Sequence, residues 1–261
     1  MVIDMKNLYC KSIEKLNRLF EYYNSNNFDN MSIEVLNFNP GEELEVLGMV
    51  ASANISRLEF KGSKPVKITG GRGMFKYAEY GGYIDFNNIF GAFDTSEMVN
   101  AVSMFDTAVI NNDIEIHDID FNKLIYAKKM FHCLDASNIY IRNVKFSRLE
   151  EYYGIFEGVY TNSFILDNVD FSNIGALDLN AGRIDKLGLI FSGSSIHEFT
   201  IYPNCKWPSH KRYSRYDILS AIFSECEIFR AVISKQDKEL ERVLNEAKYV
   251  ELINYLEDEL C

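Results

Sequence analysis

Three stretches of the chain decide its fold: DIEIHDIDF at 113–121, NIYIRNVKF at 138–146 and SFILDNVDF at 163–171. Each begins 25 residues after the one before it, and the three align without a gap. The second and fourth positions are apolar in all of them, and the residues between face the other way. Alternation of this kind predicts a short strand with one buried face. A weaker fourth copy, GLIFSG, begins at 188.

The residues after each strand predict a turn, because the sixth position holds Asp118, Asn143, Asn168 and, in the weak copy, Gly193. These residue types accept turn geometry and bond locally to the backbone. Further apolar columns follow at spacings of 25 or 26 residues, so each unit is expected to bury its apolar side against its neighbours, as in a solenoid. These columns are Ile119/Val144/Val169, Phe121/Phe146/Phe171, Leu124/Leu149/Ile174 and Phe105/Phe131/Phe156, the last preceded by Met104, Met130 and Ile155.

The segment FDTSEMVNAVSMF at 93–105 resembles the repeat of the BspA-type leucine-rich repeat family, also described as a mycoplasma-lipoprotein-type repeat of unknown function. Degenerate copies lie at 121–131 and 146–156, and GMF at 73–75 is similar to an earlier one. The resemblance covers roughly residues 70–195. It implies a curved array of strands with a binding face and without catalytic apparatus. Members are often surface or secreted adhesins, but no signal peptide is recognised here, so that location is not carried over.

Composition indicates a soluble globular protein that could form one large domain or two ordinary ones. The 261 residues are 47% hydrophobic and 25% charged, and no apolar run approaches the roughly 20 residues that a membrane span needs. The first residues mix acids and bases with apolar groups, unlike a signal peptide, so a cytoplasmic location is expected. The five cysteines, at 10, 133, 205, 226 and 261, have no paired spacing, which favours free thiols.

The net charge of −11 disfavours non-specific contact with nucleic acid or an anionic membrane. It suits a basic partner, including a protein that itself grips nucleic acid. The many Asn, Ile, Lys and Tyr residues suggest an AT-rich genome, as in a low-GC bacterium or its phage.

Both ends of the chain depart from the repeat. Apolar spacing predicts an amphipathic helix over 4–24, strands over 31–68, and helices over 216–233 and 237–260. The pairs Ser214–Asp217 and Ser234–Asp237 have the spacing of a capping pattern at the starts of the last two helices. The fold class is therefore expected to be an α/β, leucine-rich-repeat-like solenoid at 70–201. A mixed cap at 1–69 precedes it, and a basic-aromatic linker with a C-terminal helical pair at 202–261 follows. The helices could equally bind a partner or a second copy.

Motifs that carry chemistry are weak. The glycines at 70–73 lack the Lys-Ser/Thr ending of a phosphate loop, and the four histidines have no metal-ligand spacing. His132 and Cys133 are adjacent, which points their side chains apart on a strand or about 100° apart on a helix. The acids at 113, 115, 118 and 120 are scattered over different faces by the alternation. We expect no enzyme activity, no cofactor and no metal.

The outward columns of the strands form the expected partner-binding site, and Tyr140 and Arg142 are the residue types most often found as interface anchors. An alternative is a nucleic-acid site in the segment 206–216, where bases alternate with aromatics. The leading expectation is a protein-binding adaptor or inhibitor, in one version encoded by a phage or mobile element against a host defence nuclease. The partner-binding residues are Glu115, His117, Tyr140, Arg142, Ile165 and Asp167, together with Asp113, Asn138 and Ser163 in the same columns; the alternative set is Lys206, Trp207, Lys211, Arg212, Tyr213 and Arg215.

Overall fold

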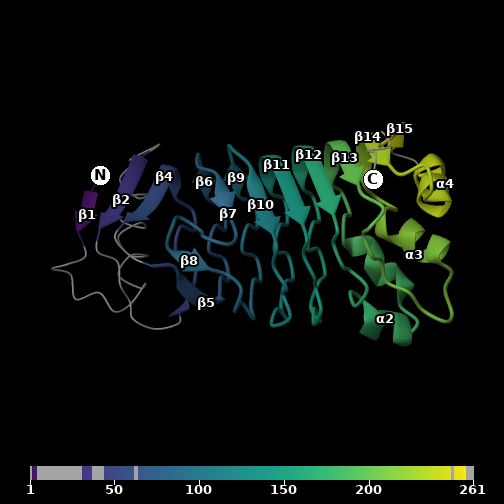
Figure 1. Cartoon of the computed structure of the whole chain (residues 1–261), viewed down its shortest axis with the longest axis horizontal. Coiled ribbons are helices and arrows are strands. Elements are labelled where there is room, and N and C mark those ends of the chain that lie inside the picture. Colours follow the sequence, from purple (N-terminus) through teal and green to yellow (C-terminus); the bar gives the residue numbers. More distant parts are fainter. Residues whose placement is uncertain (1, 5–30, 37–43, 62–63, 248–249, 257–261) are drawn as a thin grey trace.

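The computed structural model describes residues 2–4, 31–36, 44–61, 64–247 and 250–256. Within these ranges the protein is a mixed α/β fold dominated by one parallel sheet of 12 strands, accompanied by a sheet of three. Figure 1 shows the strands side by side along the long axis of the molecule, with the helices gathered toward the C-terminal end.

The central strands are the ones that the repeated stretches predict: β10 (Ile114–His117), β11 (Asp135–Arg142) and β12 (Tyr160–Asp167). Ile114 pairs with Ile139, and Ile139 with Phe164, in parallel register. All three side chains are completely buried. The prediction that equivalent residues lie as neighbours in one ladder is confirmed.

Strands continue toward the N-terminus at similar intervals. The strands expected over 31–68 are present, whereas the helix expected over 4–24 lies, apart from Asp4, outside the described residues. The main sheet begins in the order β1, β2, β4, β6, β9, β11, so it extends through the region expected to be a separate cap. The strands not yet given are β1 (Val2–Asp4), β2 (Met31–Leu36), β4 (Asn54–Lys61), β6 (Glu79–Tyr80), β7 (Ile84–Asp85) and β9 (Val109–Ile110).

Outside the main sheet, successive units also pair in parallel at two further series of positions. One line starts in the smaller sheet, formed by β3 (Leu44–Glu45), β5 (Val66–Gly70) and β8 (Phe93–Asp94). It continues as single bridges from Gly70 to Asn100, from Asn100 to Tyr126 and from Tyr126 to Glu151. Another joins Asp120 to Lys145, Lys145 to Asp170 and Asp170 to Lys206. Successive units are therefore in register at several places around their perimeter.

The turn after each central strand has the geometry that the sequence predicts. Asp118, Asn143 and Asn168 adopt left-handed backbone angles, with φ of 54°, 52° and 51°. Asn143 donates a hydrogen bond of 2.8 Å to the Asp118 carboxylate, and Asn168 donates one of 2.8 Å to the Asn143 carbonyl oxygen. Asn and Asp tolerate this conformation better than other residues with a Cβ, so the column needs them.

Aromatic rings from successive units stack on one another along the interior. The rings of Phe105 and Phe131 lie 5.4 Å apart, those of Phe131 and Phe156 5.2 Å, and those of Phe156 and Phe191 5.1 Å, all nearly parallel. Such pairs contribute about 0.5–1.5 kcal/mol each beyond the burial of their area. A second column runs from Phe121 through Phe146, Phe171 and Trp207.

The fourth copy of the strand is not where the sequence suggests. Residues 188–193 close a 3₁₀ helix, η1 (Ile184–Leu189), and enter a turn, and the strand that pairs with β12 is β13 (Ser195–Ile201). An insertion that holds α2 (Ala176–Asn180) and η1 lengthens this unit, so Phe164 pairs with Phe199.

The predicted C-terminal helical pair is also wrong. The segment 216–233 divides into α3 (Arg215–Ile222) and β14 (Glu227–Ile233), and the next segment into α4 (Lys238–Glu246) and β15 (Val250–Tyr255). Both strands join the main sheet after β13, so the sheet continues past residue 201. In β14 the residues that face the core are Ile228, Ala231 and Ile233.

Candidate functional site

The outward face of the main sheet brings the predicted partner-binding residues together. Tyr140 pairs with Glu115 on one side and with Ile165 on the other, and Arg142 pairs in the same way with His117 and Asp167. All six are partly or fully exposed, while the residues that alternate with them are buried. Two adjacent columns thus cross three strands in register. We call this surface the central sheet face.

Hydrogen bonds between neighbouring strands hold several of its polar side chains. Asn138 donates from its amide to the Asp113 carboxylate at 2.7 Å, and the Tyr83 hydroxyl donates to Glu115 at 2.7 Å. The Arg142 guanidinium lies 5.2 Å from the centre of the Tyr140 ring. That separation is within the range of a cation–π contact, so the Arg and Tyr expected to anchor a partner already support each other.

His117 sits in an acidic corner of the central sheet face. Its Nδ1 lies 2.9 Å from Asp118, its Nε2 lies 3.5 Å from Asp85, and its carbonyl oxygen accepts a hydrogen bond of 3.1 Å from the Asn87 amide. The hydrogen bond to Asp118, with the negative charges of Asp85, Asp118 and Glu115, outweighs partial burial and raises the pKa of His117 above its usual value. His117 is therefore held by acidic neighbours and is not simply surrounded by solvent.

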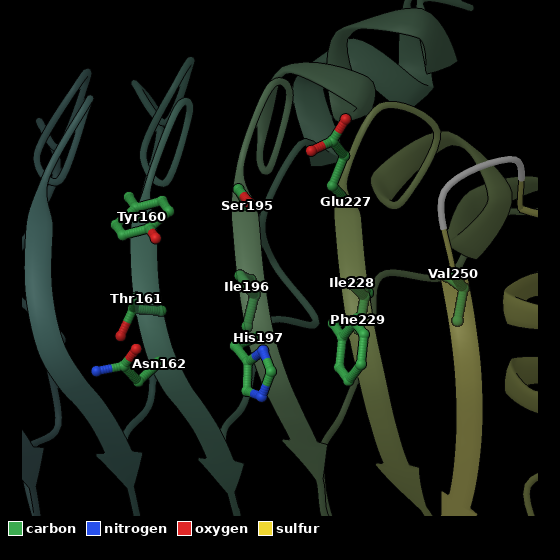
Figure 2. A pocket seen from close by; sticks show the side chains of 10 residues that line it. All are labelled: Tyr160, Thr161, Asn162, Ser195, Ile196, His197, Glu227, Ile228, Phe229 and Val250. Carbon is green, nitrogen blue, oxygen red and sulfur yellow. The ribbon is translucent and has the colours of Figure 1, made fainter.

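The sheet face extends further toward the C-terminus than sequence reasoning indicated. A hollow of about 430 Å³ lies across β12, β13, β14 and the start of β15 (Figure 2). Tyr160, with 60% of its surface exposed, and Phe229, with 48%, border it. Phe229 was missed because the segment 216–233 was assigned to a single helix. Tyr160 was missed because it lies before the repeated stretch at 163–171 from which the partner-binding residues were chosen.

The basic-aromatic segment forms internal contacts instead of one free surface. Lys206 pairs with Asp170 at 3.2 Å, and the Trp207 ring stacks on Phe171 with the ring centres 5.4 Å apart. Trp207 is thereby the end of an interior aromatic column, and Tyr213 also packs against the core.

Arg215, also in this segment, forms ion pairs within the chain. Its guanidinium contacts both Asp237 oxygens at 2.6 Å and Glu239 at 3.2 Å. Burial opposes ionisation of Asp237, but the hydrogen bonds from Arg215 outweigh it and lower the pKa of this carboxyl. Of the six residues expected to bind nucleic acid, Lys211 and Arg212 are the exposed bases that have no such ion pair in the described part of the chain.

A cysteine, a histidine and an aspartate meet in a turn on another side of the molecule. His132 Nδ1 lies 2.6 Å from Asp106, whose other oxygen lies 3.1 Å from Lys76 Nζ. Cys133 has a left-handed φ of 50°, and its Sγ lies 3.6 Å from His132 Nε2. The two neighbours are therefore not directed apart, as a strand would require.

This arrangement does not have the electrostatics of a nucleophilic cysteine. Burial, with the charges of Asp106 and Glu157, raises the pKa of Cys133 above its usual value. An activated thiol needs a lowered pKa, because the thiolate is the reactive form. We assign the contact between Asp106 and His132 to the stabilisation of adjacent turns.

Within the described ranges, no three side chains of His, Cys, Asp or Glu gather closely enough to hold a metal ion. None of the described helices combines the length and apolar character required to cross a bilayer.

Comparison with known proteins gives one match. Residues 45–168 are similar to a family described as "Mycoplasma protein of unknown function, DUF285". This supports the resemblance to mycoplasma repeats seen at 93–105, while membership of a leucine-rich repeat family stays a prediction. No curated protein and no solved structure matches the chain.

Proposed function

We propose that this protein is a non-catalytic protein–protein interaction module, built as a leucine-rich-repeat-like solenoid that docks a partner on its central sheet face. The observation that carries the proposal is the pairing of Tyr140 with Glu115 and Ile165, and of Arg142 with His117 and Asp167, on one exposed surface. A surface of strands in register presents its side chains as a fixed array, which lowers the entropy cost of binding.

The residue types in this array favour a protein partner. Tyr and Arg are enriched among the residues that dominate binding energy, and Ile165 adds an apolar contact beside them. Because an interface gains specificity from complementary charge, the surrounding acids favour a partner with basic groups.

The acidity of the whole chain supports a basic partner too, with a net charge of −11. One concrete version is an inhibitor, encoded by a phage or mobile element and acting in the cytoplasm, that occupies the basic groove of a nucleic-acid-binding defence protein of the host. Negative charge would accelerate association with such a groove.

The test is affinity purification from the native host followed by mass spectrometry, with the wild-type chain and two variants as bait. Tyr140→Ala/Arg142→Ala removes the two anchors. Tyr126→Ala/Arg148→Ala removes the same two residue types from exposed positions on another line of the molecule. We expect the first variant to lose at least about tenfold of the captured partner, as removal of two anchors should do, and the second to retain it. Equal capture by both variants would contradict the central sheet face as the docking surface.

Binding of nucleic acid through 206–216 is the second candidate, favoured by the exposure of Lys211 and Arg212. It is the weaker one, because Lys206, Trp207 and Arg215 are engaged within the chain. Titration with single- and double-stranded DNA and RNA at two salt concentrations tests it. Tight, salt-sensitive binding that Lys211→Glu/Arg212→Glu abolishes would replace our proposal.

A further inference from the structure

We propose that the hollow at the C-terminal end of the sheet face receives an arginine side chain of the partner, an inference that rests on the proposed function. The site, here named the Ser195 notch, consists of Tyr160, Ser195 and Glu227 in one row, with His197 and Phe229 in the row beside it (Figure 2).

The notch arises because a small residue stands between two large ones. Ser195 pairs with Tyr160 on one side and with Glu227 on the other, in parallel register. Neighbouring strands lie about 4.8 Å apart, so the large side chains are separated by roughly 10 Å at the backbone. The serine fills little of this width, and a planar group can lie over it between a ring and a carboxylate.

The next row gives the notch a firm side. The rings of His197 and Phe229 are stacked, with centres 4.6 Å apart and planes 8° from parallel. Because each ring limits the movement of the other, this wall is largely formed before a ligand arrives. Pre-formed sites lose less conformational entropy on binding.

Charge in the notch selects a cation. The described residues that line it include no lysine or arginine, and Glu227 makes no ion pair with any of the residues that the structure describes. A cation over Ser195 would lie within about 6 Å of the Tyr160 ring, the distance at which cation–π attraction acts. The carboxylate of Glu227 would approach from the opposite side.

Arginine fits this combination better than lysine. A guanidinium is planar, so it stacks on an aromatic face while it donates two parallel hydrogen bonds to a carboxylate. An ammonium group acts as a point charge and holds its water more strongly, which weakens its contact with the ring. An acidic or phosphorylated segment would be repelled by Glu227.

The test is an NMR titration of the isotope-labelled chain with acetyl-Gly-Arg-Gly-amide, and with the same peptide carrying citrulline, a neutral isostere of arginine. We expect the arginine peptide to change the chemical shifts of residues 160–162, 195–197 and 227–229 alone, with a Kd in the millimolar range that suits one anchored side chain. The same peptide with lysine in place of arginine should bind more weakly. The citrulline peptide should produce no shifts there.

Variants separate the two contacts. Glu227→Gln and Tyr160→Leu should each weaken the arginine peptide by about two- to fivefold, as exposed ion pairs and cation–π contacts do. The matched control is Glu150→Gln, which makes the same change of charge at an exposed position outside the notch and should leave the Kd unchanged.

Three results would overturn the proposal: equal binding of citrulline, shifts spread over the acidic surface, or an equal effect of Glu150→Gln and Glu227→Gln. The titration needs no partner, so its outcome is independent of the capture experiment. If it fails while Tyr140→Ala/Arg142→Ala still prevents capture, the notch is wrong and the central sheet face stands. If the notch binds arginine but the Tyr140→Ala/Arg142→Ala variant still captures the partner, the proposal that the central sheet face is the docking surface is wrong.

Discussion

At the scale of single residues, the turn positions Asp118, Asn143 and Asn168 show how one residue can both adopt a left-handed backbone and hydrogen-bond to the neighbouring units. Asn143 has a left-handed backbone, with φ of 52°, and also links Asp118 to Asn168 by hydrogen bonds. The sequence predicts the turn from the residue types, but not the ladder, because the stacking of amides depends on the register between units.

Replacement of Asn143 tests these two roles. We expect Asn143→Ala to lower the free energy of unfolding by about 1–2 kcal/mol, from strain at positive φ and the loss of two hydrogen bonds. Asn143→Gly removes the same hydrogen bonds but relieves the strain, so it should cost less. Urea unfolding of both variants measures the difference, and an equal cost would show that the backbone contributes nothing.

His117 links stability to pH. Its pKa in the folded protein is raised by Asp118, Asp85 and Glu115, so protonation is more favourable in the folded than in the unfolded chain. The resulting stability is fully present below the unfolded pKa of about 6.5 and is lost as pH rises through the folded value. The wild-type chain should therefore exceed His117→Gln in stability by more at pH 5.5 than at pH 9.

Urea unfolding at the two pH values checks this expectation, and NMR titration of the imidazole gives the pKa directly. Asp85→Asn should lower the pKa of His117, because it removes one of the charges that raise it. A stability difference between the wild type and His117→Gln that does not vary with pH would exclude the linkage.

At the scale of elements, the strands of the repeat were predictable and the irregular units were not. Strong alternation at 113–117, 138–142 and 163–167 specified strands, whereas the C-terminal strands follow short helices with similar apolar content. The N-cap of α3 is Ser214, as expected, and forms a capping box with Asp217. That of α4 is Asp237, three residues after Ser234, the cap that the Ser234–Asp237 spacing predicts. Helix starts were thus readable from local hydrogen-bonding types, but helix ends were not, because the apolar pattern does not break where the strand begins.

The insertion with α2 and η1 is anchored by a buried acid. Asp178 is 3% exposed and accepts hydrogen bonds from Tyr152 at 2.7 Å, from Tyr153 at 2.9 Å and from Arg183 at 2.8 Å. Burial alone would raise its pKa, but these donors outweigh burial and lower it. Such a carboxylate fixes a segment whose own helices are too short to be stable alone.

Asp178→Ala should destabilise the protein by about 2–3 kcal/mol, because it leaves two hydroxyl groups and a guanidinium without their acceptor. Asp178→Asn keeps one acceptor oxygen and should cost less. Hydrogen exchange should rise first in residues 176–189 and much less in β10 and β11. A uniform rise along the sheet would instead indicate global destabilisation, without a special role in the insertion.

At the scale of the whole molecule, the 25-residue periodicity of the sequence was the most informative predictor of the fold. The spacing of 25 residues identified the parallel ladder and the central sheet face, since equivalent side chains must align when strands pair in register. The notch could not be predicted, because it depends on unequal spacings: Tyr160, Ser195 and Glu227 meet only after units of 35 and 32 residues. Repeats of equal length can be recognised by aligning the chain with itself, but units whose length is changed by an insertion do not align.

The interior column of phenylalanine rings has a consequence for how such chains change length. Phe121 and Phe146 hold equivalent positions in adjacent layers and stack on each other. Excision of residues 121–145 would join Asp120 to Phe146 and bring each remaining ring opposite an equivalent ring. Gene duplication or slippage by a whole unit would then shorten or extend the central sheet face, while the contact between neighbouring units would keep the same aromatic stacking.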